Sequence, residues 1–295
     1  MKGGIEMTLK VLGLGDNVVD KYLHSQMMYP GGNALNFAVY AKQLGADSSF
    51  LGVFGSDMPA EHVRTTLKKI GVSLERCRNI DGENGYACIK LVNGDRVFIK
   101  SNKGGVLRNH PIILTEEDLE YIKKFDVVHT SLNSYIESEL KKIIKTKVPI
   151  SFDFSVRGTD DYFKTVCPYV TYGFVSCSDL SEQEMTIKME KLFSFGCKNV
   201  IATIGEKGAV FYNGQDKVVY KPQYVDPLDT LGAGDSFLTG FLLGMLSGIK
   251  ENNTKDVSEI ERKKNVLFAM EQGNKLAVKT VQVSGAFGYG KEISE

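Results

Sequence analysis

The sequence predicts an α/β protein in which a mostly parallel sheet lies between two layers of helices, with a smaller β-sheet attached. Three observations lead to this prediction. Apolar segments of strand length alternate with amphipathic helical segments along most of the 295 residues, a pattern typical of a parallel sheet covered on both faces. The turn signal Asn93-Gly94 interrupts this alternation with a hairpin. A glycine-rich segment at 229–237 leads directly into an apolar helix.

The composition excludes several classes of function. The chain has 36 Lys and Arg against 36 Asp and Glu, so no excess of charge indicates binding to nucleic acid or to a membrane surface. No apolar run approaches the roughly 20 residues that span a bilayer, and the apolar segment before Asp16 is too short for a signal peptide. The five cysteines form no C-x-x-C pair. We therefore expect a cytoplasmic protein with reduced thiols and no zinc site.

The first third of the chain contains the expected hairpin as well as alternating elements. Apolar periodicity predicts a strand at 8–15, a helix at 33–44, a strand at 49–54 and a helix at 59–70. Strands at 86–92 and 96–100 flank the turn signal, and residues 18–29 are also strand-like. We expect a lid made of 18–30 and 84–105. The core then consists of 8–17, 31–83 and 106–295.

Strands and helices alternate again after residue 105. Two segments are expected to open helices as capping boxes, Thr115–Asp118 and Ser134–Glu137. Strands are expected at 126–130, 148–154, 172–177 and 199–204, with a helix at about 180–195. A second hairpin is expected at 209–221, and two final helices are expected on either side of a charged loop around 250–262.

The segment Asp229–Phe237, with the sequence DTLGAGDSF, is the strongest functional signal in the chain. Free N–H groups at a helix start bind anions such as phosphate, aided by the helix dipole. We expect the N–H groups of residues 232–235 to hold nucleotide phosphates. A bound phosphate would repel Asp235, so this carboxylate is expected to accept a proton from a substrate hydroxyl. The alternative, an ordinary helix cap after a glycine turn, is disfavoured by the length of the motif.

A second segment, Pro30–Asn36, combines two glycines with two asparagines one helical turn apart. The amides of Asn33 and Asn36 suit sugar hydroxyls. By itself the segment favours a plainer interpretation, a glycine turn with Asn33 as the helix cap. Asp16, however, ends the first strand, so these polar groups converge at the carboxyl edge of the sheet, where open α/β folds bind ligands.

A third segment, Thr203–Gly208, either flanks the nucleotide or is a plain turn between a strand and a hairpin. Other catalytic motifs are absent from the sequence. There is no G-x-x-x-x-G-K-[ST], no G-x-S-x-G and no H-E-x-x-H. The four histidines form no ligand cluster, and we expect each to be a surface residue or a satisfied structural one.

Together these segments resemble the ribokinase-type, or PfkB, family of carbohydrate kinases. Gly31–Asp57 and Asp229–Phe237 match the two family motifs, and the resemblance covers essentially the whole chain after residue 8. It implies a ribokinase-like αβα core of three layers with a β-sheet lid, and an enzyme that uses ATP and Mg²⁺ to phosphorylate a sugar.

The resemblance also implies roles for individual residues. Asp235 matches the catalytic base, and the amides of Gly232, Ala233 and Gly234 match the anion hole. The positions that match sugar contacts are Asp16, Gly31, Gly32, Asn33 and Asn36. Those expected to bind the nucleotide are Thr203, Gly205, Gly208, Asp229, Thr230 and Asn274.

Within the family, the sequence most resembles fructoselysine 6-kinases. The segments that carry this likeness are Gly15–Asp20, Gly31–Ala34, Asp95–Phe98, Phe152–Ser155 and Lys279–Gln282. Ribokinases have lysine at the position of Asn33, which argues against ribose. The resemblance implies phosphorylation of the 6-hydroxyl of a fructosamine, and it leaves open a free ketose, a sugar acid, a nucleoside or a sensor without catalysis.

The metal site departs from the family pattern. Many members carry an N-x-x-E element whose glutamate helps to hold magnesium, whereas residues 176–184 lack the asparagine. We expect Glu182 in this role, with Glu184 as the alternative, and either can also be a solvated residue of a helix start. A potassium site near Asp229 and a homodimer through the lid are further possibilities that the sequence leaves open.

Overall fold

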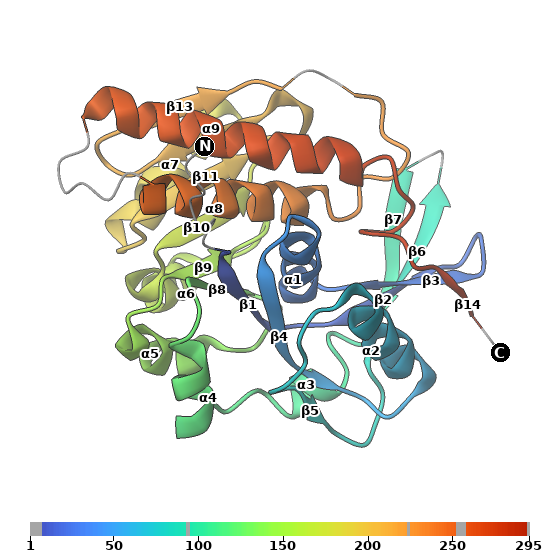
Figure 1. Cartoon of the computed structure of the whole chain (residues 1–295). Helices are drawn as coiled ribbons and strands as arrows, with labels where there is room; N and C mark the ends of the chain where they lie inside the picture. The colour runs from blue at the N-terminus through green and yellow to red at the C-terminus, as the bar shows by residue number, and fades with distance from the viewer. Residues whose placement is uncertain (1–7, 93–94, 223–224, 252–257, 294–295) are drawn as a thin grey trace, which may run out of the picture.

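The computed structural model describes residues 8–92, 95–222, 225–251 and 258–293 and contains one large and one small sheet (Figure 1). Within these ranges the large sheet has the strand order β13-β12-β11-β10-β9-β8-β1-β4-β5. The strands from β11 to β5 are parallel, and β12 and β13 add an antiparallel hairpin at one edge. The mostly parallel sheet predicted from the sequence is confirmed.

The strands of the large sheet have the following bounds: β1 Lys10–Gly15, β4 Asp47–Phe54, β5 Arg78–Asn79, β8 Val127–Ser131, β9 Ile150–Asp153, β10 Tyr172–Ser176, β11 Asn199–Thr203, β12 Ala209–Tyr212 and β13 Lys217–Tyr220. The α-helices are α1 Asn33–Gln43, α2 Met58–Ile70, α3 Val106–Asn109, α4 Glu116–Ile122, α5 Leu140–Ile143, α6 Asp160–Val166, α7 Glu182–Ser194, α8 Ala233–Glu251 and α9 Glu259–Thr280. Short 3₁₀ turns lie at Glu137–Glu139, Ile144–Thr146, Cys167–Tyr169 and Gly205–Lys207.

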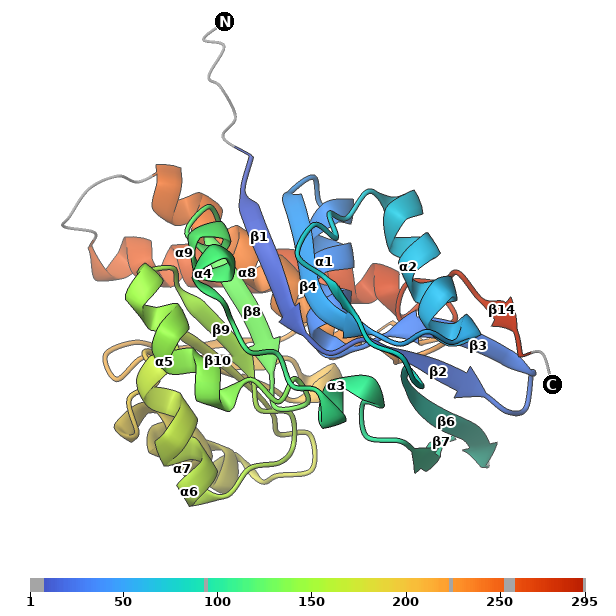
Figure 2. The ribbon, with the colours of Figure 1, turned by 90° about the horizontal axis from the view of Figure 1, so that it is seen from below.

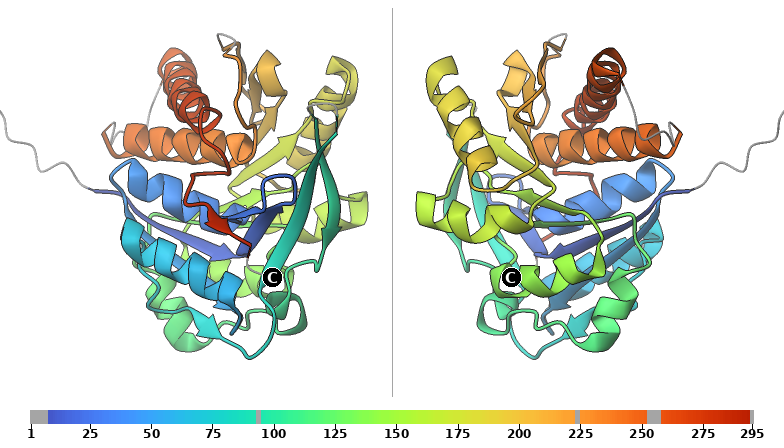
Figure 3. Two further views of the ribbon diagram at one scale, coloured as in Figure 1. Left: turned by 90° about the vertical axis from the view of Figure 1, so that its right-hand side faces the viewer. Right: turned by 90° about the vertical axis from the view of Figure 1, so that its left-hand side faces the viewer.

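Helices cover both faces of the large sheet because successive side chains of a strand point to opposite sides. On β1, Val11 packs in the core formed with α1, α8 and α9, whereas Leu12 packs in the core formed with α3 to α7. Figure 2 and Figure 3 show these two layers with the sheet between them. The three-layer αβα architecture therefore follows from apolar residues on both faces of each central strand.

Two close contacts between backbones fix the position of the helices that carry the candidate site. A Cβ atom at Gly13 of β1 would lie 2.2 Å from the carbonyl oxygen of Ala34, so α1 packs directly against the strand. A Cβ atom at Gly240 of α8 would lie 2.7 Å from the carbonyl oxygen of Gln272 in α9. Glycine at these positions allows the close packing of α1 on β1 and of α8 on α9.

The small sheet has the strand order β14-β3-β2-β6-β7 in the described part of the chain. Its strands are β2 Val18–Tyr22, β3 Met27–Gly31, β6 Gly85–Val92, β7 Asp95–Ser101 and β14 Lys291–Glu292. It projects from one side of the main body (Figure 1). Strand β14 pairs with β3, so residues near the C-terminus, which the sequence assigns to the core, add a strand to this sheet. The core and lid boundaries otherwise stay a prediction.

Most of the elements expected from the sequence are present within one to three residues of their expected bounds, and two expectations are wrong. Ser134 does not cap a helix. Its hydroxyl binds Asp16, and only a 3₁₀ turn and the four-residue α5 follow. The charged loop is shorter than expected, because Ser258 caps α9 and the helix begins at Glu259. The turn Asn93-Gly94 lies outside the described residues.

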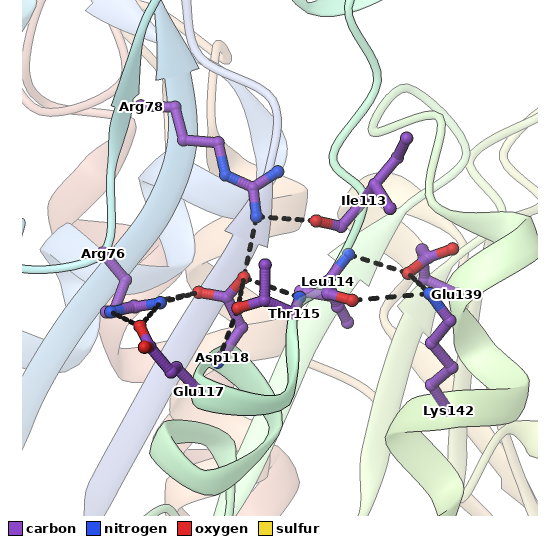
Figure 4. Close-up of polar contacts among 9 residues, drawn as sticks. All are labelled: Arg76, Arg78, Ile113, Leu114, Thr115, Glu117, Asp118, Glu139 and Lys142. Atoms are coloured by element: carbon purple, nitrogen blue, oxygen red, sulfur yellow. Dashed lines mark hydrogen bonds and ion pairs between the residues drawn. The ribbon is translucent and has the colours of Figure 1, made fainter.

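A cluster of polar residues attaches the edge strand β5 to α4 (Figure 4). The buried Asp118 carboxylate accepts hydrogen bonds from Arg76 at 2.9 Å and Arg78 at 2.7 Å. It also accepts the backbone N–H of Thr115 at 2.9 Å, which completes the predicted capping box of α4. Burial raises the pKa of Asp118, but these hydrogen bonds and charges outweigh burial and hold the pKa below its usual value.

We predict that Asp118→Ala lowers the free energy of unfolding by about 2 to 4 kcal/mol, since it leaves two guanidinium groups without their buried partner. The exposed Glu117 also pairs with Arg76, and Glu117→Ala is a matched control expected to cost less than about 0.5 kcal/mol. Urea denaturation measures both losses. Because the pKa of Asp118 is lowered in the folded state, its contribution is complete above the unfolded pKa and disappears as the pH falls through the folded pKa. Equal losses for the two variants would contradict this assignment.

Candidate active site

Asp235 lies in the first turn of α8, immediately after the glycine-rich loop. Gly232 has a φ of +75°, and a Cβ atom there would lie 2.5 Å from the Tyr40 hydroxyl. Only glycine fits this position, and it lets the loop pass against α1. The residue Asp235 is partly exposed, so a ligand can reach it. The N–H groups of Gly234 and Asp235 belong to the first turn, where an α-helix offers no acceptor.

Two asparagines of α1 hold the Asp235 carboxylate. Asn33 Nδ2 donates to Asp235 Oδ1 at 2.7 Å, and Asn36 Nδ2 donates to Asp235 Oδ2 at 2.6 Å. The two amides are one helical turn apart and therefore lie on the same face of α1. The structure thus brings together three residues that the sequence singles out in segments about 200 positions apart.

Burial raises the pKa of Asp235 to about 6, and the negative charge of Asp16 adds to this rise. The hydrogen bonds from Asn36 and Asn33 act in the opposite direction, because they stabilise the ionised form. A carboxylate with this pKa is a better base than an ordinary aspartate and remains mostly ionised at neutral pH.

Asp16 lies between β1 and β2, where the chain passes from the large sheet into the small one. Its carboxylate accepts the N–H groups of Asn33 at 2.8 Å and of Ala34 at 3.1 Å at the start of α1. The hydroxyls of Ser131 and Ser134 donate to Asp16 Oδ1 at 3.2 and 3.0 Å. Asp16 therefore does what Asn33 was expected to do in the plainer interpretation: it caps α1, and the Asn33 side chain is left to reach Asp235.

A buried histidine fixes the orientation of the Asn33 amide. Asn33 Oδ1 lies 2.8 Å from His129 Nε2, and His129 Nδ1 lies 2.8 Å from the hydroxyl of Ser151. Burial lowers the pKa of His129 to about 3, so the ring is neutral. Since Asn33 Oδ1 can only accept, the proton resides on Nε2, and Ser151 donates to Nδ1. Both N–H groups of the Asn33 amide are thereby directed toward carboxylates.

The second of these carboxylates belongs to Asp153, the last residue of β9. Asn33 Nδ2 donates to Asp153 Oδ2 at 2.7 Å, and the N–H of Ser155 donates to Asp153 Oδ1 at 2.7 Å. Burial raises the pKa of Asp153 to about 7, with a further rise from the charge of Asp235. Asp153 is partly exposed, like Asp235. No sequence motif points to a role for Asp153, although it ends a strand at the same edge of the sheet as Asp16.

A pocket of about 620 Å³ adjoins the glycine-rich loop. Its polar edge contains five residues expected to bind a nucleotide, Thr203, Gly205, Gly208, Thr230 and Asn274, together with Gly234 of the first turn of α8. Its apolar walls come from the segment before the loop, with Val225 and Pro227, and from the end of α9 and the residue after it, with Ala277, Val278 and Val281. A Cβ atom at Gly234 would meet no atom within 4 Å, so the start of α8 borders open space.

Three further predicted residues, Asp229, Gly31 and Gly32, are not among those that line the pocket. Asp229 accepts hydrogen bonds from the N–H groups of Leu231 and Gly285 and from the hydroxyl of Tyr22 in β2, at 2.8 to 2.9 Å. It orders the loop and ties it to the small sheet. Gly31 ends β3 and Gly32 connects it to α1, and a Cβ atom at Gly32 would lie 2.8 Å from the carbonyl oxygen of Asp16.

Glu182 is exposed at the start of α7 and is not among the residues that line the pocket. Glu184 completes the capping box of that helix with Ser181. In the described parts of the chain, no group of three or more His, Cys, Asp or Glu residues is arranged to hold a metal ion. The role of Glu182 stays a prediction. No described helix is long and apolar enough to cross a membrane.

Comparison with known proteins assigns this chain to a class. It belongs to the pfkB family of carbohydrate kinases, whose model matches residues 5–288. It is therefore an ATP-dependent carbohydrate kinase, and sugar and ATP are its substrates.

Two relatives in sequence and one solved structure illustrate what this chain is similar to within the family. The chain is 42% identical to the fructosamine kinase FrlD of Bacillus subtilis, over 96% of this chain and 94% of that protein. It is 28% identical to the fructoselysine 6-kinase of Escherichia coli, over 93% and 98% of the two chains. The structure of Arabidopsis thaliana ribokinase complexed with ribose and ATP superposes with a TM-score of 0.76 at 20% identity, over 96% and 95% of the two chains. The ribokinase-like fold is thereby confirmed.

We predict that the carboxyl of Asp235 titrates near pH 6 in the free enzyme, well above an ordinary aspartate at about 3.9. Asn36→Ala removes a hydrogen bond to the ionised form and is expected to raise this pKa further. Carbon-13 NMR of the labelled carboxyl, assigned by its absence in Asp235→Asn, measures both values. A wild-type value near 4, or a lower value in Asn36→Ala, would contradict the geometry.

Proposed function

We propose that this chain is a fructosamine kinase that transfers the γ-phosphate of ATP to the 6-hydroxyl of a fructosamine such as fructoselysine. The observation that carries the proposal is the match, over nearly the full length of both chains, to a protein named as a fructosamine kinase. The arrangement of Asp235, Asn33 and Asn36 beside a glycine-rich helix start supports the chemistry.

The catalytic step in this proposal depends on Asp235. The 6-hydroxyl approaches the carboxylate, which accepts the proton as the oxygen attacks the γ-phosphorus and ADP leaves on the opposite side. The N–H groups of residues 232–235 stabilise the negative charge on the phosphate oxygens. Because only the ionised carboxylate accepts a proton, turnover falls as the pH drops through the pKa of Asp235.

ATP fits the pocket beside this loop. Its apolar walls suit the adenine ring, and its polar edge at Thr203, Gly205 and Gly208 suits the ribose and the phosphates. Gly234 borders the pocket, which brings the anion-binding end of α8 to the phosphate end of such a ligand. The sugar occupies the space next to Asp235, Asn33 and Asp16 at the carboxyl edge of the sheet.

The small sheet acts as the lid in this proposal. Strand β2 continues directly from β1 through Asp16, and Tyr22 of β2 binds Asp229 of the glycine-rich loop at 2.8 Å. A movement of the small sheet would therefore affect both the sugar site at Asp16 and the glycine-rich loop at Asp229. Val97, Phe98 and Ile99 of β7 are exposed, with Phe98 at 63%. The proposal includes a homodimer in which a second lid covers these apolar residues.

Cations are a further part of the proposal. Few acidic residues surround the pocket, which fits magnesium bound mainly by phosphate oxygens and water, with Glu182 as a distant ligand through water. Magnesium would neutralise the charge of the phosphates. The proposal also includes a potassium ion bound near Asp229, as the resemblance to the family suggests.

We predict that Asp235→Asn lowers kcat by about 10²- to 10⁴-fold, the usual loss when a positioned base is removed. ADP release with fructoselysine, fructose, ribose and adenosine measures this loss and the choice of substrate together. Wild-type enzyme is expected to have its highest kcat/KM with fructoselysine.

Asp161→Asn is a matched control, since its side chain is 93% exposed. It is expected to retain wild-type turnover. Near-normal kcat in Asp235→Asn would remove Asp235 from the mechanism, and a wild-type preference for another sugar would overturn the proposed substrate.

A further inference from the structure

Asp153 and Asp235 approach one another closely at the site. Asn33 Nδ2 lies 2.7 Å from Asp153 Oδ2 and 2.7 Å from Asp235 Oδ1. The distance between these two oxygens therefore cannot exceed the sum of the two hydrogen-bond lengths. One hexulose unit can span this separation. A sugar whose 6-hydroxyl faces Asp235 can therefore present another of its polar groups to Asp153.

The site holds negative charge that no cationic side chain of the described residues balances. Among the described residues, no lysine or arginine forms an ion pair with Asp153, Asp235 or Asp16. The Asn33 amide donates one N–H to each of the two carboxylates, and it carries no charge to balance theirs. Unbalanced buried charge is costly, and a cationic donor from a ligand would relieve it.

An independent observation also indicates a missing donor. Asn36 is 4% exposed, and its Nδ2 donates to Asp235. Its Oδ1 is buried and has no hydrogen-bond partner among the described residues. A buried amide oxygen without a donor is rare in folded proteins. This acceptor belongs to the amide that donates to Asp235, so the site also lacks a donor on the side of Asp235.

A fructosamine supplies the kind of group that the site lacks. It differs from fructose by a secondary amine on C1, which is protonated at neutral pH and carries two N–H donors. Resting on the function proposed above, we propose that Asp153 binds the protonated C1 amine of a fructosamine and thereby selects it over neutral ketoses. Asp235 then faces the 6-hydroxyl at the other end of the same sugar.

The two carboxylates consequently have different roles, although the Asn33 amide donates an N–H to each of them. Asp235 meets a hydroxyl whose proton it must take, and Asp153 meets an ammonium group whose charge it must balance. An amine bound there also favours the ionised form of Asp153, because a nearby positive charge stabilises a carboxylate. Asp153 is thus a specificity-determining residue in this inference.

The test compares kcat/KM for fructoselysine with kcat/KM for fructoselysine acetylated on the C1 nitrogen, where the amide is uncharged. Wild-type enzyme is expected to prefer the free amine by about 10- to 100-fold, the usual effect of one hydrogen bond to a charged group. Asp153→Asn is expected to remove most of this preference. Asp153→Glu, which keeps the charge, should retain more of it, and Asp161→Asn should retain all of it.

Several outcomes would overturn the inference. A wild-type preference that Asp153→Asn preserves would show that another residue recognises the amine. Equal kcat/KM for the two compounds in wild-type enzyme would show that the charge is not recognised, whether or not the variants fold. Wild-type enzyme that phosphorylates ribose or fructose but not fructoselysine would overturn the proposed function itself, and the inference with it.

Discussion

The side-chain amide of Asn33 connects the parts on which the site depends. Its nitrogen binds Asp235 at the start of α8 and Asp153 at the end of β9, and its oxygen is fixed by His129 of β8. Three elements that are distant in the sequence thus meet at one residue of α1. If the amide were rotated, its oxygen would face both carboxylates, and the Asp235 base would lose a donor that favours its ionised form.

The sheet topology makes this convergence possible. From β1 the chain proceeds outward to β4 on one side and later to β8 on the other, so the crevice between them lies at a switch point of the parallel sheet. Asp16, Ser131 and Asp153 lie at the carboxyl ends of β1, β8 and β9. Gly13 allows α1 to pack directly on β1, and this packing places Asn33 and Asn36 over the same edge.

The sequence contains enough local information to predict the fold and part of the site. The glycine-rich start of α8, the paired asparagines and the position of Asp16 are each visible within a few residues. By contrast, the link between Asn33 and Asp153 spans 120 positions, and that between Asn33 and His129 spans 96. Ser134 resembles a helix cap locally, yet its hydroxyl binds Asp16 118 positions away. Such pairings depend on strand order, which local patterns do not specify.

Asn33 acts on catalysis through Asp235, and a double-mutant cycle on kcat tests this coupling. Turnover is measured for wild type, Asn33→Ala, Asp235→Asn and the double variant at saturating substrate. If the two residues act as a unit, Asn33→Ala lowers kcat in the wild-type background and has little further effect once Asp235 is replaced. If Asn33→Ala lowers kcat by the same factor in both backgrounds, the two residues act independently, and Asn33 does not act through Asp235.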